Sequence, residues 1–185
     1  YRPAPPGLRA QPRLAKEPSM ERLWSPWRLD YVTGATDTSG NDCVFCVAPG
    51  LPASESLVVA RADACFVVLN LYPYNNGHLL VVPNRHIGSL AETTPEELAE
   101  LMVLTRRAEI ALTEAYRPHG MNIGINVGRP AGAGVPGHLH IHVVPRWEGD
   151  TNFMTVIGET RVVPEELPRT LTRLTPIFAR LAEDR

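Results

Sequence analysis

The sequence predicts an α+β fold with a mostly antiparallel sheet, one central helix and a C-terminal helix. Strand-like segments rich in β-branched and aromatic residues gather in two blocks, residues 56–83 and 121–145. A segment with apolar residues at helical spacing lies between the blocks, and another ends the chain. Strands and helices therefore do not alternate one by one, which disfavours the βαβ units of a parallel sheet.

The two blocks predict five strands. The first block contains SLVVA at 56–60, ACFVVLN at 64–70 and GHLLVVP at 77–83. The turn-like stretches RAD and YPYNNG separate these segments, so we expect an antiparallel meander. The second block contains MNIGINV at 121–127 and HLHIHVVP at 138–145, joined by the loop GRPAGAGVPG.

The central helix has a well-defined start. Thr94 is the expected N-cap, Pro95 suits the first helical position, and Glu97 lies three residues after the cap, as in a capping box. We expect the helix to stop near His119 and Gly120. Its apolar face is predicted from Leu98, Leu101, Met102, Ala108 and Leu112.

One globular domain with two additions is the expected organisation, since 185 residues with 44 % hydrophobic content suit a single core. Residues 1–19 hold five prolines and little apolar surface, which predicts a disordered leader. Residues 20–163 form the domain, beginning with an apolar docking segment at 20–34. Residues 164–185 form a C-terminal helix packed on it, predicted from Leu167, Leu171, Leu174, Ile177, Phe178 and Leu181.

Composition excludes several functional classes. The formal net charge is −2, without the basic excess typical of proteins that bind nucleic acid or membrane surfaces. No apolar run reaches the roughly 18 to 20 residues that cross a bilayer. Three cysteines are too few for a disulfide scaffold, and Cys43-x2-Cys46 suits a metal or redox pair. We expect a cytoplasmic protein.

Three of the six histidines, His138, His140 and His142, occupy alternate positions of the last predicted strand. Alternate strand residues share a face at intervals of about 6.6 Å, so the imidazoles should line one side of the sheet. Two chemistries stay open on this evidence. Three imidazoles can hold a catalytic zinc ion with an open fourth position. Alternatively, one imidazole is a nucleophile whose tautomer is set by a hydrogen bond to its other nitrogen.

A glycine-rich loop precedes these histidines. The stretch NVGRPAGAGVPG places four glycines between Asn126 and His138. Glycine lets backbone N–H groups turn toward an anion at close range, so the loop favours a phosphate-containing ligand over zinc-bound water. Arg85 and Arg146 lie near enough in sequence to add positive charge.

These motifs resemble the histidine triad family. HLHIHVV matches the alternation of histidine and apolar residues that names the family, and LNLYPYNNGHLLVVPNRHIGSL resembles its upstream half. The likeness runs from about Cys43 to Trp147. RLWSPWRLDY and RWEGDTNFMTVIGETRVVPEEL are similar to a bacterial branch that includes the diadenosine tetraphosphate phosphorylases. The resemblance implies the family's α+β fold and a homodimer.

The resemblance also implies a role for each histidine. His140 would attack the α-phosphorus of a nucleotide and form a nucleotidyl-histidine. His142 would sit behind it in a hydrogen-bonded relay, and His78 would be the fourth histidine of that constellation. His138 would serve the active site as well as a metal. Asn70 occupies the place of the ribose contact.

Phosphate binding is implied for Asn126 and for the amides around Gly132 and Gly134, with a divalent ion such as Mg²⁺ assisting on the substrate. Many family members carry a Gln and a Ser or Thr in this loop, where the hydroxyl can assist the leaving group. Residues 133–137 read AGVPG instead, in a loop one residue longer. Leaving-group handling should therefore differ from the common pattern.

A second site is implied for Cys43, Cys46, His86 and His138. Some family members close a structural zinc site with residues in these positions. Four sulfur and nitrogen ligands make a closed tetrahedral site, which would hold the N-terminal segment on the sheet and perform no chemistry.

The function expected from these features is a nucleotidyl hydrolase or transferase that cleaves dinucleoside polyphosphates such as diadenosine tetraphosphate. Water or inorganic phosphate would complete the second step. Two alternatives stay open: a dimeric nucleotide- or zinc-binding module with incidental turnover, and a hydrolase whose catalytic zinc is held by the three triad histidines. Expected partners are an adenine nucleotide or dinucleoside polyphosphate and a second copy of the chain, with no nucleic acid and no membrane.

Overall fold

The computed structural model describes residues 43–52, 55–150 and 165–183. The predicted leader at 1–19 and the docking segment at 20–34 lie outside these ranges. Among the helices of the described ranges, none is long and apolar enough to span a bilayer.

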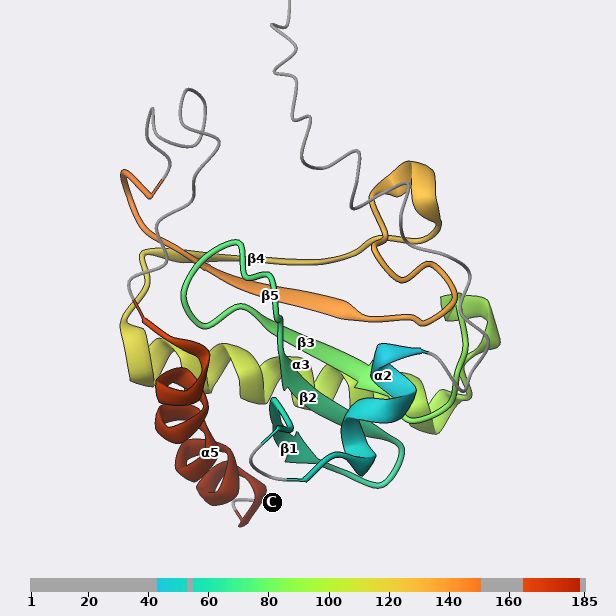
Figure 1. Cartoon of the computed structure of the whole chain (residues 1–185), viewed down its shortest axis with the longest axis horizontal. Helices are drawn as coiled ribbons and strands as arrows, with labels where there is room; N and C mark the ends of the chain where they lie inside the picture. Colours follow the sequence, from blue (N-terminus) through green and yellow to red (C-terminus); the bar gives the residue numbers. More distant parts are fainter. Residues whose placement is uncertain (1–42, 53–54, 151–164, 184–185) are drawn as a thin grey trace, which may run out of the picture.

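A five-stranded antiparallel sheet forms the centre of the described fold (Figure 1). Its strands are β1 (Val58–Arg61), β2 (Cys65–Leu69), β3 (Leu79–Pro83), β4 (Gly120–Ile125) and β5 (Ile141–Arg146). Their order in space is β1-β2-β3-β5-β4, and every neighbouring pair is antiparallel. The predicted α+β class is confirmed. The order sets β5, which contains His142, directly beside β3, which follows His78.

Strand register determines which histidines meet. Leu80 of β3 lies opposite His142 of β5. Because strand residues alternate between faces, His78 shares the face of Leu80 and therefore that of His142. The pairing thus brings together two histidines that are 64 positions apart in the chain.

The last strand is shorter than predicted. β5 begins at Ile141, so His138 and His140 precede it. The backbone N–H of Leu139 donates to the oxygen of Ile87 at 2.6 Å, a bond to the loop after β3. Before Ile141, Leu139 therefore bonds to this loop and does not take part in the hydrogen-bond ladder of the sheet.

Two long helices, α3 (Pro95–Tyr116) and α5 (Leu167–Glu183), confirm the predicted central and C-terminal helices. The capping box on α3 is present, with Thr94 and Glu97 bonded reciprocally. α3 ends earlier than predicted, because Arg117 adopts a left-handed conformation. The shorter helices are α2 (Val44–Val47), η1 (Ala48–Gly50), η2 (Leu90–Glu92) and η3 (Arg129–Ala131).

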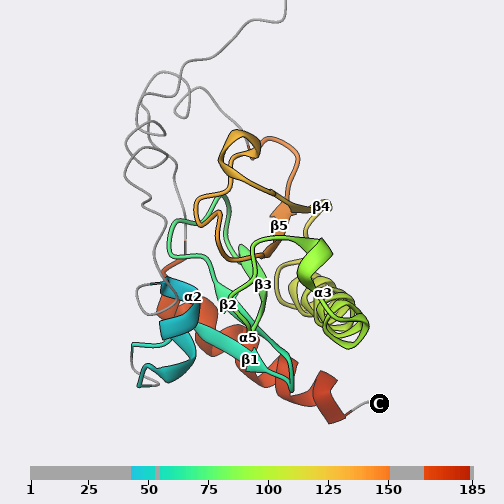
Figure 2. The ribbon, with the colours of Figure 1, turned by 90° about the vertical axis from the view of Figure 1, so that its right-hand side faces the viewer.

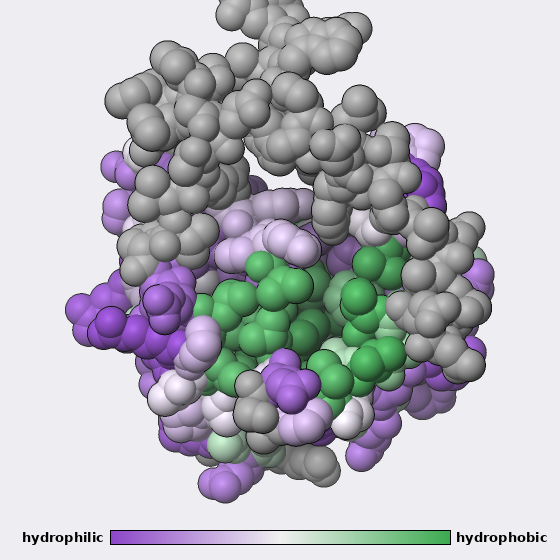
Figure 3. Space-filling model, viewed as in Figure 1, coloured by the Kyte–Doolittle hydropathy of each residue, from purple (hydrophilic) through white to green (hydrophobic). Residues whose placement is uncertain are grey.

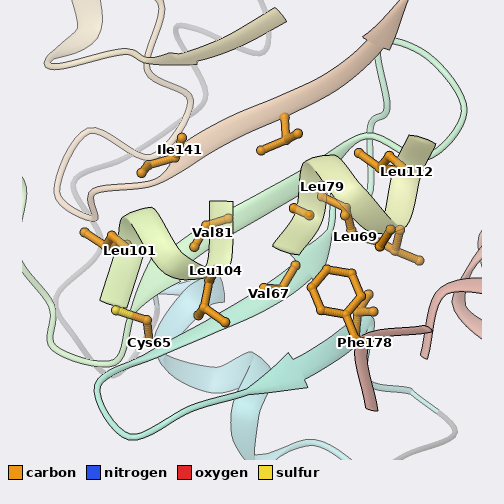
Figure 4. Close-up of a cluster of buried hydrophobic side chains, with 14 of the residues drawn as sticks. Cys65, Val67, Leu69, Leu79, Val81, Leu101, Leu104, Leu112, Ile141 and Phe178 are labelled. Carbon is orange, nitrogen blue, oxygen red and sulfur yellow. The ribbon is translucent and has the colours of Figure 1, made fainter. Parts of the chain in front are cut away.

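The main core lies between the sheet and the two long helices. Figure 2 shows α3 and α2 on opposite sides of the sheet, and α5 packs against both α3 and β1. Alternate residues of β2 and β3 point toward α3 (Figure 4). The buried residues of this core include Cys65, Val67, Leu69, Leu79, Val81, Leu101, Leu104, Leu112, Ile141 and Phe178.

The opposite face of the sheet carries a smaller cluster under α2. It contains Cys43, Phe45, Phe66, Val68, Leu80 and Val82. The surface on this side is apolar at its centre (Figure 3). Val44 of α2 and Leu71, just after β2, are 60 % and 58 % exposed. This face combines apolar surface with histidines, which makes it the candidate site.

Candidate active site and metal centre

A hydrogen bond to the backbone sets the tautomer of His140. Its Nδ1 lies 2.8 Å from the backbone oxygen of His138. A carbonyl oxygen only accepts, so Nδ1 carries the proton and Nε2 keeps a lone pair. His140 is 3 % exposed, and burial lowers the pKa of its imidazole. At neutral pH the ring is therefore uncharged, with a nucleophilic Nε2.

His78 and His142 form a directed pair. His78 Nδ1 accepts the backbone N–H of Tyr74 at 3.1 Å, so its proton lies on Nε2. That proton is donated to Nδ1 of His142 across 3.0 Å. Neutral His142 then carries its proton on Nε2, with its ring centre 4.9 Å from that of His140. Burial, and secondarily repulsion from His140 when both rings are protonated, lower the pKa of His142 to about 4.

His140 and His142, expected to share one hydrogen-bonded relay, thus have separate hydrogen-bond partners. His142 bonds to His78, and the group behind His140 is the backbone oxygen of His138. Tyr74, which was not among the predicted site residues, also lies against this pair. Its ring stacks on His142 at 15°, with centroids 5.9 Å apart. Its position in the turn before His78 was the available signal.

Asn70 lies beside the same pair, at the end of β2. Its Nδ2 is 3.2 Å from Nδ1 of His78, and its Oδ1 accepts the backbone N–H of Tyr72 at 3.0 Å. The structure therefore brings Asn70 to the histidines. The ribose contact expected for it stays a prediction.

The glycine-rich loop is braced from within. Gly128 and Gly132 have φ of 79° and 94°, which glycine adopts without strain. The N–H of Gly132 donates to the oxygen of Arg129 at 2.9 Å, and Asn126 Nδ2 donates to the oxygen of Gly132 at 3.4 Å. Phosphate contacts by Asn126, Gly132 and Gly134 stay predictions, and for Gly132 they require its amide to turn.

The four residues of the second predicted site lie close together. Cys43, Cys46, His86 and His138 each direct one donor atom to a common point, and these atoms lie within 4.8 Å of one another. Nδ1 of His138 is 3.3 Å from Sγ of Cys43, and Nδ1 of His86 is 3.3 Å from Sγ of Cys46. Zn–S and Zn–N bonds of ordinary length place tetrahedral S and N donors roughly 3.6 Å apart. The four residues therefore fit a zinc ion.

A further bond prepares His138 for this role. Its Nε2 lies 2.9 Å from the backbone oxygen of Pro83, so the proton is on Nε2 and Nδ1 presents a lone pair to the cysteines. A carbonyl behind a histidine is the usual orienting partner of a metal-bound imidazole. The cysteines and histidines thus form a candidate metal-binding group.

The three triad histidines do not converge on one point. His138 faces the cysteines, His140 uses Nδ1 on a carbonyl, and His142 uses Nδ1 on His78. The potential metal-binding group found in the described part of the chain contains neither His140 nor His142. This geometry disfavours the alternative in which the three histidines hold a catalytic zinc.

Arg85 and Arg146 each bind a carboxylate. Arg85 makes two hydrogen bonds to Glu97, at 2.6 and 2.7 Å, at the start of α3. Arg146 makes two to Asp150, both at 2.6 Å. Both guanidinium charges, which were expected to help bind the phosphates, are therefore balanced by neighbouring carboxylates.

Comparison with known proteins agrees with the geometry. The HIT domain model matches residues 52–149, more than half of the chain. The chain belongs to the HIT family. This HIT protein is 42 % identical over 173 residues to the AP-4-A phosphorylase of Mycobacterium tuberculosis, covering 90 % of this chain and 89 % of the relative.

Two further relatives place the HIT protein more broadly. It is 32 % identical over 125 residues to the asymmetrical bis(5'-nucleosyl)-tetraphosphatase of Schizosaccharomyces pombe, covering 68 % of this chain and 64 % of the relative. A crystal structure of a Zn-bound histidine triad family protein from Mycobacterium smegmatis aligns with a TM-score of 0.63 and 28 % identity. That alignment covers 80 % of this chain and all of the other.

Proposed function

We propose that this HIT protein cleaves dinucleoside polyphosphates, diadenosine tetraphosphate first, through a nucleotidyl-histidine at His140. The observation that carries the proposal is the bond from His140 Nδ1 to a backbone carbonyl, which leaves Nε2 as an uncharged nucleophile. The names of the M. tuberculosis and S. pombe relatives support the substrate class.

The reaction would proceed in two displacements. Nε2 of His140 forms a bond to the α-phosphorus while the bond to the bridging oxygen breaks, and the rest of the polyphosphate leaves with its electron pair. His142 would donate its Nε2–H to a phosphoryl or leaving oxygen, and the bond from His78 to its Nδ1 supports this role. Water or inorganic phosphate then attacks the same phosphorus and releases His140.

We propose supporting roles for the surrounding residues. Asn70 would contact the ribose, and Asn126 with the Gly132 and Gly134 amides would hold phosphate oxygens. The exposed apolar surface near Val44 suits a nucleobase. A divalent ion such as Mg²⁺ would arrive with the substrate and neutralise phosphate charge.

We also propose that Cys43, Cys46, His86 and His138 hold a structural zinc ion. The ion would fill a closed site and add stability by joining α2 to the loop residues beside the triad. The Zn-bound relative supports this assignment.

A homodimer is the third proposal. β4 lies at the end of the strand order, so one side of it has no strand partner within the described residues. Ile123 in this strand is 46 % exposed. An open strand edge with apolar side chains is a natural place for a second copy to pair.

Intact-mass spectrometry tests the enzymatic proposal. After a pulse of diadenosine tetraphosphate, the wild-type chain should gain the mass of one adenylyl group, whereas His140→Ala should gain none. Products distinguish the second nucleophile, because hydrolysis yields AMP and ATP and phosphorolysis yields ADP and ATP. Full activity in His140→Ala would refute the covalent mechanism.

A further inference from the structure

An ionic cluster follows β5, and the proposed chemistry does not use it. Asp150 accepts two hydrogen bonds from Arg146, both at 2.6 Å, and a third from the backbone N–H of Trp147 at 3.1 Å. The Asp150 side chain is 10 % exposed. Paired bonds from a guanidinium to a carboxylate are directional and among the stronger side-chain contacts.

The same carboxylate reaches across to the turn before His78. Asn75 donates through Nδ2 to Asp150 at 2.8 Å and to the backbone oxygen of Pro145 at 3.0 Å. Both hydrogens of the Asn75 amide are therefore used. In turn, the backbone oxygen of Asn75 accepts the N–H of His78 at 3.2 Å. Asp150 is thus linked to the backbone of His78 by two hydrogen bonds, both made by Asn75.

The turn is held on its other sides as well. Asn76 accepts the backbone N–H of Glu165 through Oδ1 at 3.4 Å. Gly77 has φ of 74°, and a Cβ at this position would meet Leu112 at 2.8 Å and Tyr116 at 3.0 Å. The Gly77 end of the turn therefore packs closely against α3. Asp150 restrains the other end of the turn, at Asn75.

Turn position matters because the His78 ring is bonded at both nitrogens. Nδ1 accepts from the turn residue Tyr74, and Nε2 donates to His142. A shift of the turn by about 0.5 Å would lengthen the 3.0 Å bond beyond good hydrogen-bond geometry. His142 would then lose the partner that selects its tautomer.

We propose that Asp150 is a positioning residue for the His78–His142 pair, acting through Asn75. The proposal rests on the proposed function, because it assigns this pair to the adenylyl transfer. Asp150→Asn replaces one acceptor oxygen with an NH₂ group, which must then face a donor of Arg146 or Asn75. The turn should loosen although side-chain volume is kept.

Single-turnover adenylylation by diadenosine tetraphosphate measures the effect. Asp150→Asn should slow adduct formation between about tenfold and a hundredfold. The substrate concentration that gives half of the maximal adduct rate should change much less. In a His78→Ala background the same substitution should slow it no further, because the residue through which Asp150 acts is gone. Asn75→Ala, which leaves the Arg146–Asp150 pair in place, should reproduce the loss.

Glu97→Gln is the matched control, since it breaks another two-bond Arg–carboxylate pair, with Arg85. It should reduce stability while leaving the adduct rate unchanged. An unchanged rate in Asp150→Asn, or a loss of equal size with and without His78, would overturn the proposal.

Nitrogen-15 NMR of the histidine rings separates this proposal from the proposed function. Asp150→Asn should shift the ring signals of His78 and His142, and Glu97→Gln should not. If the wild-type chain forms no adduct, the enzymatic proposal fails by that result alone. Unshifted ring signals in Asp150→Asn would refute the positioning role independently of activity.

Discussion

His142 shows how burial and one neighbour set the state of a single side chain. Its pKa is lowered to about 4 by burial and by His140. The ring therefore remains neutral through the range in which a free histidine gains its charge. A neutral His142 can accept from His78 and donate through Nε2 at the same time.

Acid should destabilise the protein through this residue. Between pH 6.5 and about pH 4 the unfolded chain binds a proton at His142 that the folded chain does not, so the free energy of unfolding falls as pH falls. His142→Gln should reduce the slope of stability against pH in that window. Urea denaturation at several pH values measures the slope, and an identical slope in the variant would contradict this assignment.

The structure brings together histidines and cysteines that the sequence singled out, but their hydrogen-bond partners could not be predicted. The structure brings His78 to His142 and the two cysteines to His86 and His138. Alternation along the chain predicts a shared face for the triad, whereas the hydrogen-bond partner of each imidazole depends on what the neighbouring strands and loops carry. The role of the His138 carbonyl could not be inferred, because every residue has one.

At the scale of elements, α3 was predicted best at its start. The capping box is local, since Thr94 and Glu97 satisfy each other's backbone within four positions. The hydrogen bonds from Arg85 and from the Thr94 backbone lower the pKa of Glu97 to about 2. Burial raises this pKa, but its effect is smaller than that of the hydrogen bonds. The helix end was predicted too late, because Arg117 adopts a left-handed conformation that its residue type does not favour.

Thr94→Ala should lower the free energy of unfolding by about 1 kcal/mol, because the N–H of Glu97 loses its acceptor. Chemical denaturation should show a lower midpoint with an unchanged slope. Thr113→Ala is the matched control, since this exposed hydroxyl bonds an oxygen within the same helix and caps nothing. Equal losses in the two variants would show that the cap does not stabilise α3.

Strand β5 shows the limit of pattern alone. The alternation from 138 to 145 predicts a continuous strand, yet the ladder starts at Ile141. The bond from Leu139 to Ile87 diverts the preceding residues. That diversion accompanies the separation of His138, which lies beside Cys43, from His142, which lies beside His78.

In the molecule as a whole, the candidate metal centre joins parts that are distant in sequence. Cys43 and His138 are 95 positions apart, and α2 has only four residues. A closed zinc site there should add substantially to stability, since metal binding and folding are coupled.

Removing the metal should therefore lower Tm. Elemental analysis should find about one zinc per wild-type chain, as four ligands close one site, and a strong chelator should reduce Tm. Cys43→Ser should lose both the metal and the chelator effect. Cys65→Ala is the control, because Cys65 is buried in the main core, and it should retain the zinc. Zinc retained in Cys43→Ser would refute the assigned ligands.

Assembly can be tested at the β4 edge. Ile123→Asp should reduce the molar mass measured by light scattering from that of a dimer to that of one chain, because a charge would be placed in the proposed interface. Leu51→Asp changes another exposed apolar residue, next to β1 at the far end of the strand order, and should keep the dimer. A monomeric wild-type chain would contradict the proposal.

Features that depend on neighbours along the chain could be predicted from the residues alone: the α+β class, the start of α3 and the residues available for chemistry. Which of those residues meet depends on how the strands and loops pack. Asn75 and Asp150 are 75 positions apart, and strand order and loop packing alone bring them into contact. Local spacing sets the face on which a side chain lies, whereas its bonding partner depends on segments that only folding brings together.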